Sequence, residues 1–219
     1  MKTKDRILAT SLLLFNEEGE PNVTTVDIAN EMEISPGNLY YHFRGKEIII
    51  EELYDQFERE MADILSAPIQ KKISVEDSWF YLYVVFEHIY SYRFLYFNLT
   101  DIMQRYEKIQ RRFKRLLKSK TSTLRALCND MIRNDTLKFS SDDEAEFLVN
   151  QVVLTMLYWM NFNMLNERLS KSPEVLMHDG VFQVMSLVAP HVSDDKKEFF
   201  NECKALYHEL IKKSQTKPI

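Results

Sequence analysis

The sequence has little glycine, proline or cysteine. Four glycines and six prolines among 219 residues leave few of the residues that the many tight turns of a β-rich fold require. The two cysteines, Cys128 and Cys203, have no paired spacing, which excludes a disulfide framework and indicates a reducing compartment such as the cytoplasm. We therefore expect an almost all-α protein that is cytoplasmic.

Motifs of the common enzyme classes are also missing. The chain has no nucleophile elbow, no glycine-rich phosphate loop and too few glycines to build them. His178, His191 and His208 do not lie four residues apart, and no carboxylate spacing supports them as metal ligands. We expect no catalytic residue, no metal and no cofactor. An enzyme that uses Glu87 and His88 is the remaining catalytic alternative.

Neither apolar run of the chain predicts a targeting or membrane segment. The run from Ile7 to Phe15 follows basic residues but has no small-residue cleavage pattern after it, and its period fits the buried side of a first helix. The window from Phe147 to Asn166 has no charge, yet six amide and hydroxyl side chains are scattered through it. We therefore expect no membrane association.

The stretch from Thr24 to Lys46 predicts two short helices joined by a tight turn. Thr24 is a suitable N-cap, and Asp27 can close a capping box with it. Ser35 is a second N-cap followed by Pro36 at the first helical position. Because so few residues separate them, the helices must cross steeply, which predicts a helix-turn-helix.

The second of these helices is rich in groups that bind or stack on nucleic acid. It has few charges but several hydrogen-bonding and aromatic side chains, and Lys46 follows where a phosphate contact is expected. A plain helical hairpin with a tyrosine-rich surface is the alternative. The candidate DNA-binding residues are Thr24, Thr25, Ser35, Pro36, Gly37, Asn38, Tyr40, Tyr41, His42 and Lys46.

The N-terminal quarter resembles the DNA-binding domain of TetR-family transcriptional regulators. The family pattern T-x-x-x-I-A, a turn, then L-Y-x-H-F-x-x-K is matched in order and spacing by Thr24, Ile28, Ala29, Leu39, Tyr40, His42, Phe43 and Lys46. The resemblance implies a repressor that binds a DNA operator and responds to a small molecule. One residue departs from the pattern: Glu33 stands where the family commonly has a turn glycine, which matters if that position needs a positive φ.

The charge of this segment does not by itself favour DNA. Residues 1 to 46 hold five basic and seven acidic side chains, a net charge of −2. Because affinity for DNA rises with the number of phosphates neutralised, one such domain would bind weakly. A homodimer that places two recognition helices on a palindromic operator would restore the affinity.

A second candidate site lies in an aromatic segment that we expect to be one buried helix from Val75 to Asn98. Its aromatic side chains could wall a pocket for a hydrophobic or aromatic effector, with a few polar groups inside. An aromatic core with satisfied tyrosines is the alternative. Three further candidates lie in the uncharged window from Phe147 to Asn166, which we expect to be a buried helix. The candidate ligand-binding residues are Trp79, Tyr83, Phe86, Glu87, Tyr90, Arg93, Phe94, Met156, Trp159 and Met160.

The basic stretch from Asp101 to Lys120 holds eight basic and two acidic residues. It lies in one helix, or in two broken near Lys120, spanning Ile102 to Arg133. The excess charge could attract an acidic partner or DNA, although a solvated helix face is the simpler interpretation.

The domain organisation follows from these segments. We expect a helix-turn-helix domain over residues 1–46, a linking helix over 47–65 that ends before Pro68, and a helical regulatory domain over 66–219. The family resemblance places the dimer surface on the last two helices, Pro173 to Val188 and Asp194 to Lys213. The sequence identifies neither the effector, if one exists, nor the operator.

Overall fold

The computed structural model describes residues 2–70, 75–170 and 172–198, together with 201, 202, 204, 205 and 209. The chain forms two compact units, one from residues 1–62 and 91–116, the other from residues 63–90 and 117–219. Throughout the described residues every regular element is a helix, and Leu137 and Val192 form an isolated bridge. The predicted all-α class is confirmed.

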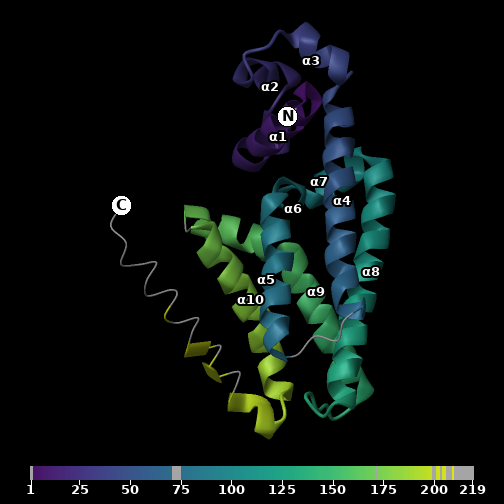
Figure 1. Cartoon of the computed structure of the whole chain (residues 1–219), viewed down its shortest axis with the longest axis vertical. Helices are drawn as coiled ribbons and strands as arrows, with labels where there is room; N and C mark the ends of the chain where they lie inside the picture. Colours follow the sequence, from purple (N-terminus) through teal and green to yellow (C-terminus); the bar gives the residue numbers. More distant parts are fainter. Residues whose placement is uncertain are drawn as a thin grey trace. The chain divides into compact units, whose positions relative to one another are not determined.

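The first unit contains the N-terminal helices and interleaves them with a later segment (Figure 1). Helix α1 buries the side chains of Ile7, Leu8, Leu14 and Phe15, as its period predicts. The elements of this unit are α1 (Thr3–Glu18), η1 (Glu20–Asn22), α2 (Thr25–Glu31), α3 (Pro36–His42), the first part of α4 (Lys46–Gln70), α6 (Phe94–Phe97), α7 (Leu99–Arg105) and the first part of α8 (Glu107–Arg133).

The two helix starts of the predicted helix-turn-helix are confirmed by their caps. The Thr24 hydroxyl accepts from the backbone N–H of Asp27 at 3.2 Å, and the Asp27 carboxylate accepts from the backbone N–H of Thr24 at 2.8 Å. The Thr24 hydroxyl also donates to the Asp27 carboxylate at 2.6 Å, and this bond, together with the one from the Thr24 backbone N–H, holds the pKa of Asp27 below its usual value. The Ser35 hydroxyl accepts from the backbone N–H of Asn38 at 3.1 Å. Both caps are local, so sequence alone could predict them.

The turn between α2 and α3 places Glu33 in the left-handed region. Its φ is +55°, which is the condition that makes glycine favourable at this position. The turn is closed by the Ile34 N–H, which donates to the carbonyl of Ala29 at 3.0 Å, and the side chains of Ala29 and Leu39 are buried beneath it. The turn therefore forms without glycine, at the expense of backbone strain at one residue.

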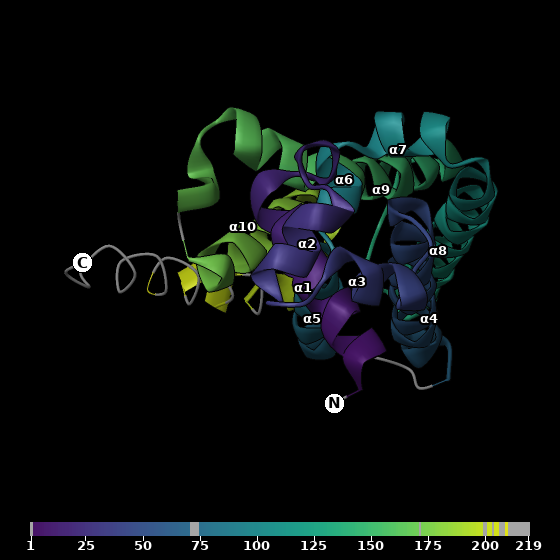
Figure 2. The same ribbon diagram turned by 90° about the horizontal axis from the view of Figure 1, so that it is seen from above.

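Helix α8, which holds most of the basic stretch, runs beside α4 in both views (Figures 1 and 2). Arg112 forms ion pairs with Asp55 and Glu58, and Lys108 lies 3.2 Å from Glu51. Much of the local positive charge is therefore paired within the first unit, which leaves less of it for a nucleic-acid contact than the sequence suggests.

The second unit packs the aromatic and apolar helices together. Gly180 on α10 lets α5 and α9 approach, because a Cβ there would come within 2.9 Å of the rings of Phe86 and Trp159. The indole N–H of Trp159 donates to the carbonyl of Leu176 at 3.1 Å. The elements of this unit are most of α5 (Val75–Ser91), the rest of α4 and α8, α9 (Asp142–Leu165), η2 (Arg168–Ser170), α10 (Pro173–Val188), η3 (Ala189–His191) and η4 (Asp194–Lys196).

Three expected helix boundaries are wrong. The aromatic helix ends at Ser91 rather than Asn98, and Phe80 on it is 71% exposed rather than buried. The next helical stretch breaks at Tyr106, not near Lys120, and α4 continues past Pro68 to Gln70. Packing determines where these helices end, and local propensity predicts such ends poorly.

Part of the expected C-terminal helix lies outside the described residues, including Phe199, Phe200, Cys203, Leu206, Tyr207, His208 and Leu210. Across the described ranges, none of the helices is long and apolar enough to cross a membrane.

Replacing Glu33 with glycine tests the strained turn. We expect Glu33→Gly to raise the free energy of unfolding by about 0.5–1 kcal/mol, because glycine adopts φ near +55° without a Cβ clash. The matched control is Glu31→Gly, which replaces a helical residue of α2 and should lower stability by a similar amount. Urea unfolding of both variants measures the difference, and a loss of stability in Glu33→Gly contradicts the strain assignment.

Candidate nucleic-acid interface and ligand cavity

Helix α3 and its flanking turns present the side chains that the sequence assigns to DNA. Tyr41 is 85% exposed and Tyr40 is 61% exposed, which is unusual for large aromatic side chains. His42 is half-buried. The centroids of the His42 and Tyr41 rings lie 5.2 Å apart, in a T-shaped arrangement. Ser35, Pro36, Gly37 and Asn38 are all exposed along the start of the helix. The surface is polar and aromatic, as base stacking and groove contacts require.

A surface hollow brings most of the remaining candidates together. Its lining includes Thr24 and Thr25 from α2 together with Pro36 and Tyr40 from α3. The lining also includes Arg44, an exposed residue in the turn after α3. The sequence assignment omitted Arg44, although its position immediately after Phe43 was an available signal. Its guanidinium is suited to a phosphate contact.

Lys46 differs from the other candidates because its ammonium group binds inside the fold. The Nζ atom donates to the carbonyl oxygens of Glu20 and Val23 at 2.7 and 2.8 Å and lies 3.0 Å from the Glu20 carboxylate. The expected phosphate contact of Lys46 stays a prediction, and it competes with these internal bonds.

The partner of Lys46, Glu20, is a fully buried carboxylate. Its side chain is 0% exposed and is also bound by the guanidinium of Arg105 and by the hydroxyl of Tyr106 at 3.2 Å. We call Glu20, Lys46, Arg105 and Tyr106 the Glu20 cluster. It joins η1, the start of α4 and the end of α7, so it holds the base of the helix-turn-helix in position.

Most of the candidate ligand residues lie in the packed interior of the second unit. Phe86, Met156, Trp159 and Met160 are at most 5% exposed. Trp79 and Tyr83 are half-buried and face the ring of His178, at 6.3 and 4.8 Å between ring centroids. Their ligand role stays a prediction, while their contacts are those of a core.

The other four candidates differ in exposure and in the unit to which they belong, and their ligand role stays a prediction. Glu87 is exposed and Tyr90 is half-buried. Arg93 and Phe94 belong to the first unit, where Phe94 is fully buried and packs against Phe15 at 5.5 Å. Of the two residues of the catalytic alternative, Glu87 is exposed and its neighbour His88 is 7% exposed.

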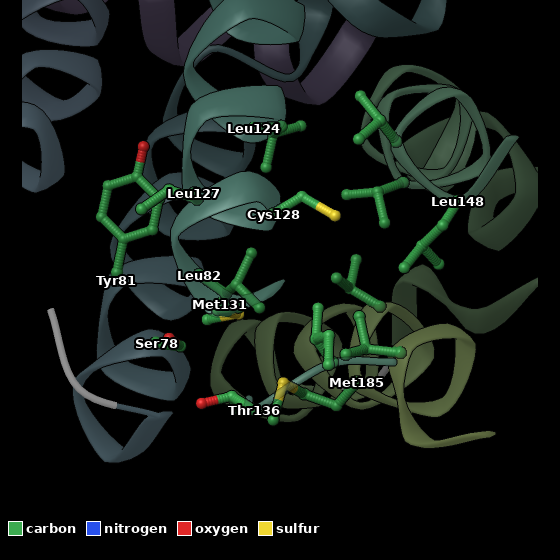
Figure 3. A pocket seen from close by; sticks show the side chains of 15 residues that line it. Ser78, Tyr81, Leu82, Leu124, Leu127, Cys128, Met131, Thr136, Leu148 and Met185 are labelled. Carbon is green, nitrogen blue, oxygen red and sulfur yellow. The ribbon is translucent and has the colours of Figure 1, made fainter. Parts of the chain in front are cut away.

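A different set of residues surrounds a cavity of about 90 Å³ in the second unit (Figure 3). Its walls come from α5, α8, α9 and α10 and from Thr136 and Leu137 in the connection between α8 and α9, and they are almost entirely aliphatic. Burial raises the pKa of the Cys128 thiol and raises the pKa of Tyr81 to about 12, so both groups are neutral near pH 7. The lining residues are Ser78, Tyr81, Leu82, Leu124, Leu127, Cys128, Met131, Thr136, Leu137, Leu148, Val149, Val152, Val184, Met185 and Val188.

The sequence assignment included none of these lining residues. It followed aromatic side chains, whereas the cavity lies where four helices pack imperfectly against one another. A pattern of leucine and valine indicates burial but does not reveal whether the buried space is filled. In the described part of the chain, no group of three or more His, Cys, Asp or Glu is arranged to hold a metal.

Two family models match the chain in adjoining segments. One, described as bacterial regulatory proteins of the tetR family, matches residues 7–53. The other, TetR, described as a bacterial transcriptional repressor, matches residues 56–200. Together they cover both the helix-turn-helix and the segment that contains the cavity.

Two named relatives match about a quarter of the chain. IcaR of Staphylococcus aureus, named as the HTH-type negative transcriptional regulator of the biofilm operon icaADBC, is 41% identical over 49 residues, which are 22% of this chain and 26% of IcaR. YttP of Bacillus subtilis, named as a probable HTH-type transcriptional regulator, is 30% identical over 57 residues, 26% of this chain and 28% of YttP. The matched stretch spans about a quarter of the length of each relative.

Solved structures match nearly the whole chain. A TetR-family transcriptional regulator from Marinobacter aquaeolei VT8 has a TM-score of 0.83 and 31% identity, over 95% of this chain and 98% of that one. The ketosteroid transcriptional regulator KstR2 of Mycobacterium tuberculosis has a TM-score of 0.67 and 17% identity, over 88% and 96% of the two chains, and it shows the fold alone.

Removing the ammonium group of Lys46 tests the Glu20 cluster. We expect Lys46→Ala to lower the free energy of unfolding by about 2–4 kcal/mol, because it leaves the buried carboxylate with fewer partners. The control is Lys4→Ala, which removes an exposed ion pair with Glu52 and should cost below about 1 kcal/mol. Chemical denaturation measures both, and equal losses would mean that the buried contacts of Lys46 do not contribute to stability.

Proposed function

The chain belongs to the TetR family of bacterial transcriptional regulators, and we propose that it is a repressor whose homodimer binds a palindromic DNA operator and is released by a small hydrophobic effector. The observation that carries the DNA part of the proposal is the exposed surface of α3 within a capped helix-turn-helix. We expect the protein to act in the cytoplasm, where the DNA of a bacterium lies.

The proposed DNA contacts divide into two kinds. Asn38, Tyr40, Tyr41 and His42 offer amide, hydroxyl, ring and imidazole groups to the base edges in a major groove. Thr24, Thr25, Ser35 and Arg44 surround this surface and would bind phosphates. Pro36 and Gly37 carry no side chain that blocks the approach of the DNA backbone.

An apolar stripe on α9 supports the proposed homodimer. Large side chains at spacings of seven, four, four and three residues follow one face of this helix, as in helices that pack against a partner helix. Such a stripe exceeds the scattered apolar exposure that is normal for a protein surface. Its members are Phe147 (64% exposed), Leu154 (58%), Tyr158 (49%), Phe162 (47%) and Leu165 (78%).

The apolar stripe on α9 would be buried if it packed against the same stripe of a second copy of the chain, which gives a symmetric contact. Two linked recognition helices bind one operator together, so their joint affinity compensates for the net acidic charge of each N-terminal segment. The dimer surface expected on α10 and the C-terminal segment would then include α9.

The cavity supports the proposed effector response. An effector that binds better when the recognition helices are wrongly spaced for the operator shifts the population toward that state. The effector needs only to bind more tightly to the conformation that does not fit the operator than to the one that does. The Glu20 cluster lies at the base of the helix-turn-helix, where α7 and α4 meet, and would carry such a shift to the DNA-binding surface.

Two substitutions on the DNA-binding surface test operator binding. Tyr41→Ala should weaken binding to the selected operator by about 1–3 kcal/mol and relax its sequence preference, because it removes a proposed base contact. Arg44→Ala should weaken binding to all sequences and reduce the slope of log K against log salt by about 1. Phe80→Ala, which removes another exposed aromatic side chain, on α5, is the control. Fluorescence anisotropy on a duplex selected from a random library measures both effects at several salt concentrations. Unchanged binding in both variants contradicts the DNA-binding assignment.

A charge placed in the α9 stripe tests the dimer. We expect Leu154→Glu to convert a dimer into a monomer, because two carboxylates would be buried at the symmetric contact. Leu13→Glu is the control, since Leu13 is 51% exposed on α1 and lies outside the stripe. Light scattering coupled to size-exclusion chromatography gives the mass of each variant. A dimeric Leu154→Glu variant would place the dimer contact elsewhere, and a monomeric wild type would remove the dimer from the proposal.

A further inference from the structure

The cavity in the second unit is more uniform in its chemistry than an aromatic pocket. Eleven of its fifteen lining residues are Leu, Val or Met, and Tyr81 supplies its one aromatic ring among the described residues. The polar atoms of the lining side chains are the hydroxyls of Ser78, Tyr81 and Thr136 and the thiol of Cys128. Figure 3 shows the Cys128 sulfur directed toward the middle of the cavity, with Ser78 and Thr136 along one edge.

No charged side chain is found among the described residues of this lining. A carboxylate or ammonium group that entered it would lose its hydration without gaining an opposite charge, and this strongly opposes binding of ions. On α8, Lys120 lies one helical turn before Leu124, the first lining residue of that helix. It is buried but is not part of the lining.

The residues that line the cavity favour aliphatic chains over rings as ligands. Leucine and valine side chains offer no ring face for stacking, so an aromatic ligand would gain little beyond its buried area. Met131 and Met185 have flexible thioether side chains that adapt to an irregular chain. A water molecule needs roughly 10–15 Å³ of such space, so the cavity of about 90 Å³ holds a chain of about six to nine heavy atoms.

We propose that the effector of this protein is an uncharged aliphatic molecule of medium chain length with at most one hydroxyl or carbonyl group. The inference rests on the proposed function, because it specifies the chemical class of the effector. It excludes ionised fatty acids and planar aromatic compounds as preferred ligands.

A matched series of ligands tests the class. Isothermal titration calorimetry on the full chain at pH 7.5 compares 1-octanol, octanoate, octylammonium and 4-ethylphenol, an aromatic compound with as many heavy atoms as 1-octanol. We expect 1-octanol to bind at least about tenfold more tightly than either ion and more tightly than 4-ethylphenol. Tighter binding of octanoate would overturn the proposal and direct attention to Lys120, and tighter binding of 4-ethylphenol would restore the aromatic pocket.

Two pairs of matched variants place the ligand in the cavity. Val152→Phe fills the cavity and should abolish octanol binding, whereas Val153→Phe, on the next residue and outside the lining, should not. Met131→Lys adds a cation at a half-buried lining position from which a lysine side chain can reach water, and should shift the preference toward octanoate. Met164→Lys makes the same change outside the lining and should leave the preference unchanged. Equal effects within either pair would overturn the assignment of this cavity.

The regulator function is measured separately in the same preparations. Ligand-free protein is titrated with its selected operator, and 1-octanol is then added to the complex. Failure of the ligand-free protein to bind any duplex overturns the proposed function and leaves the octanol preference standing. Operator binding together with an absence of alcohol binding overturns only the inference about the effector.

Discussion

The burial of one carboxylate, that of Glu20, constrains the whole first unit. A buried charge is tolerated only when opposite charges and hydrogen bonds surround it, and here Lys46, Arg105 and Tyr106 supply them. Lys46 comes from the start of α4, and Arg105 and Tyr106 come from the end of α7, which is far from both Glu20 and Lys46 in sequence. The buried carboxylate of Glu20 therefore fixes the positions of α4 and α7 relative to η1. The Lys46 ammonium also binds the Val23 carbonyl, one residue before the cap of α2.

This arrangement changes the role of a residue that belongs to the family motif. Its position after the recognition helix predicts a phosphate contact for Lys46, whereas its ammonium group is bound by the Glu20 carboxylate and two carbonyl oxygens. Arg44, two residues earlier and exposed, is the better candidate for a phosphate contact. The acidic character of the N-terminal segment has a related explanation. Part of its negative charge serves internal pairs, such as Glu20 with Lys46 and Arg105, and does not face a nucleic acid.

The two candidate sites differ in how far sequence could predict them. The helix-turn-helix depends on caps, a turn and a short spacing, all of which are local, and the structure contains the predicted Thr24 and Ser35 caps and a positive φ at Glu33. The cavity depends on how four helices fail to fill the space between them. Aromatic residues such as Phe86 and Trp159 attracted the sequence assignment, yet Gly180 allows them to pack tightly. Leucine and valine line the space that remains.

The sequence by itself determined the helical class, the family and the residues at the recognition helix, because these follow from composition and from contacts within a few residues of one another. Tertiary structure decided which charges are buried, where the aromatic and basic helices end, and which side chains surround a cavity. The physical reason is that burial depends on neighbours distant in sequence. In the sequence Glu20 resembles any surface acid, and only the tertiary structure places Arg105 beside it. Leu148 likewise resembles any core residue, and only the tertiary structure places a cavity next to it.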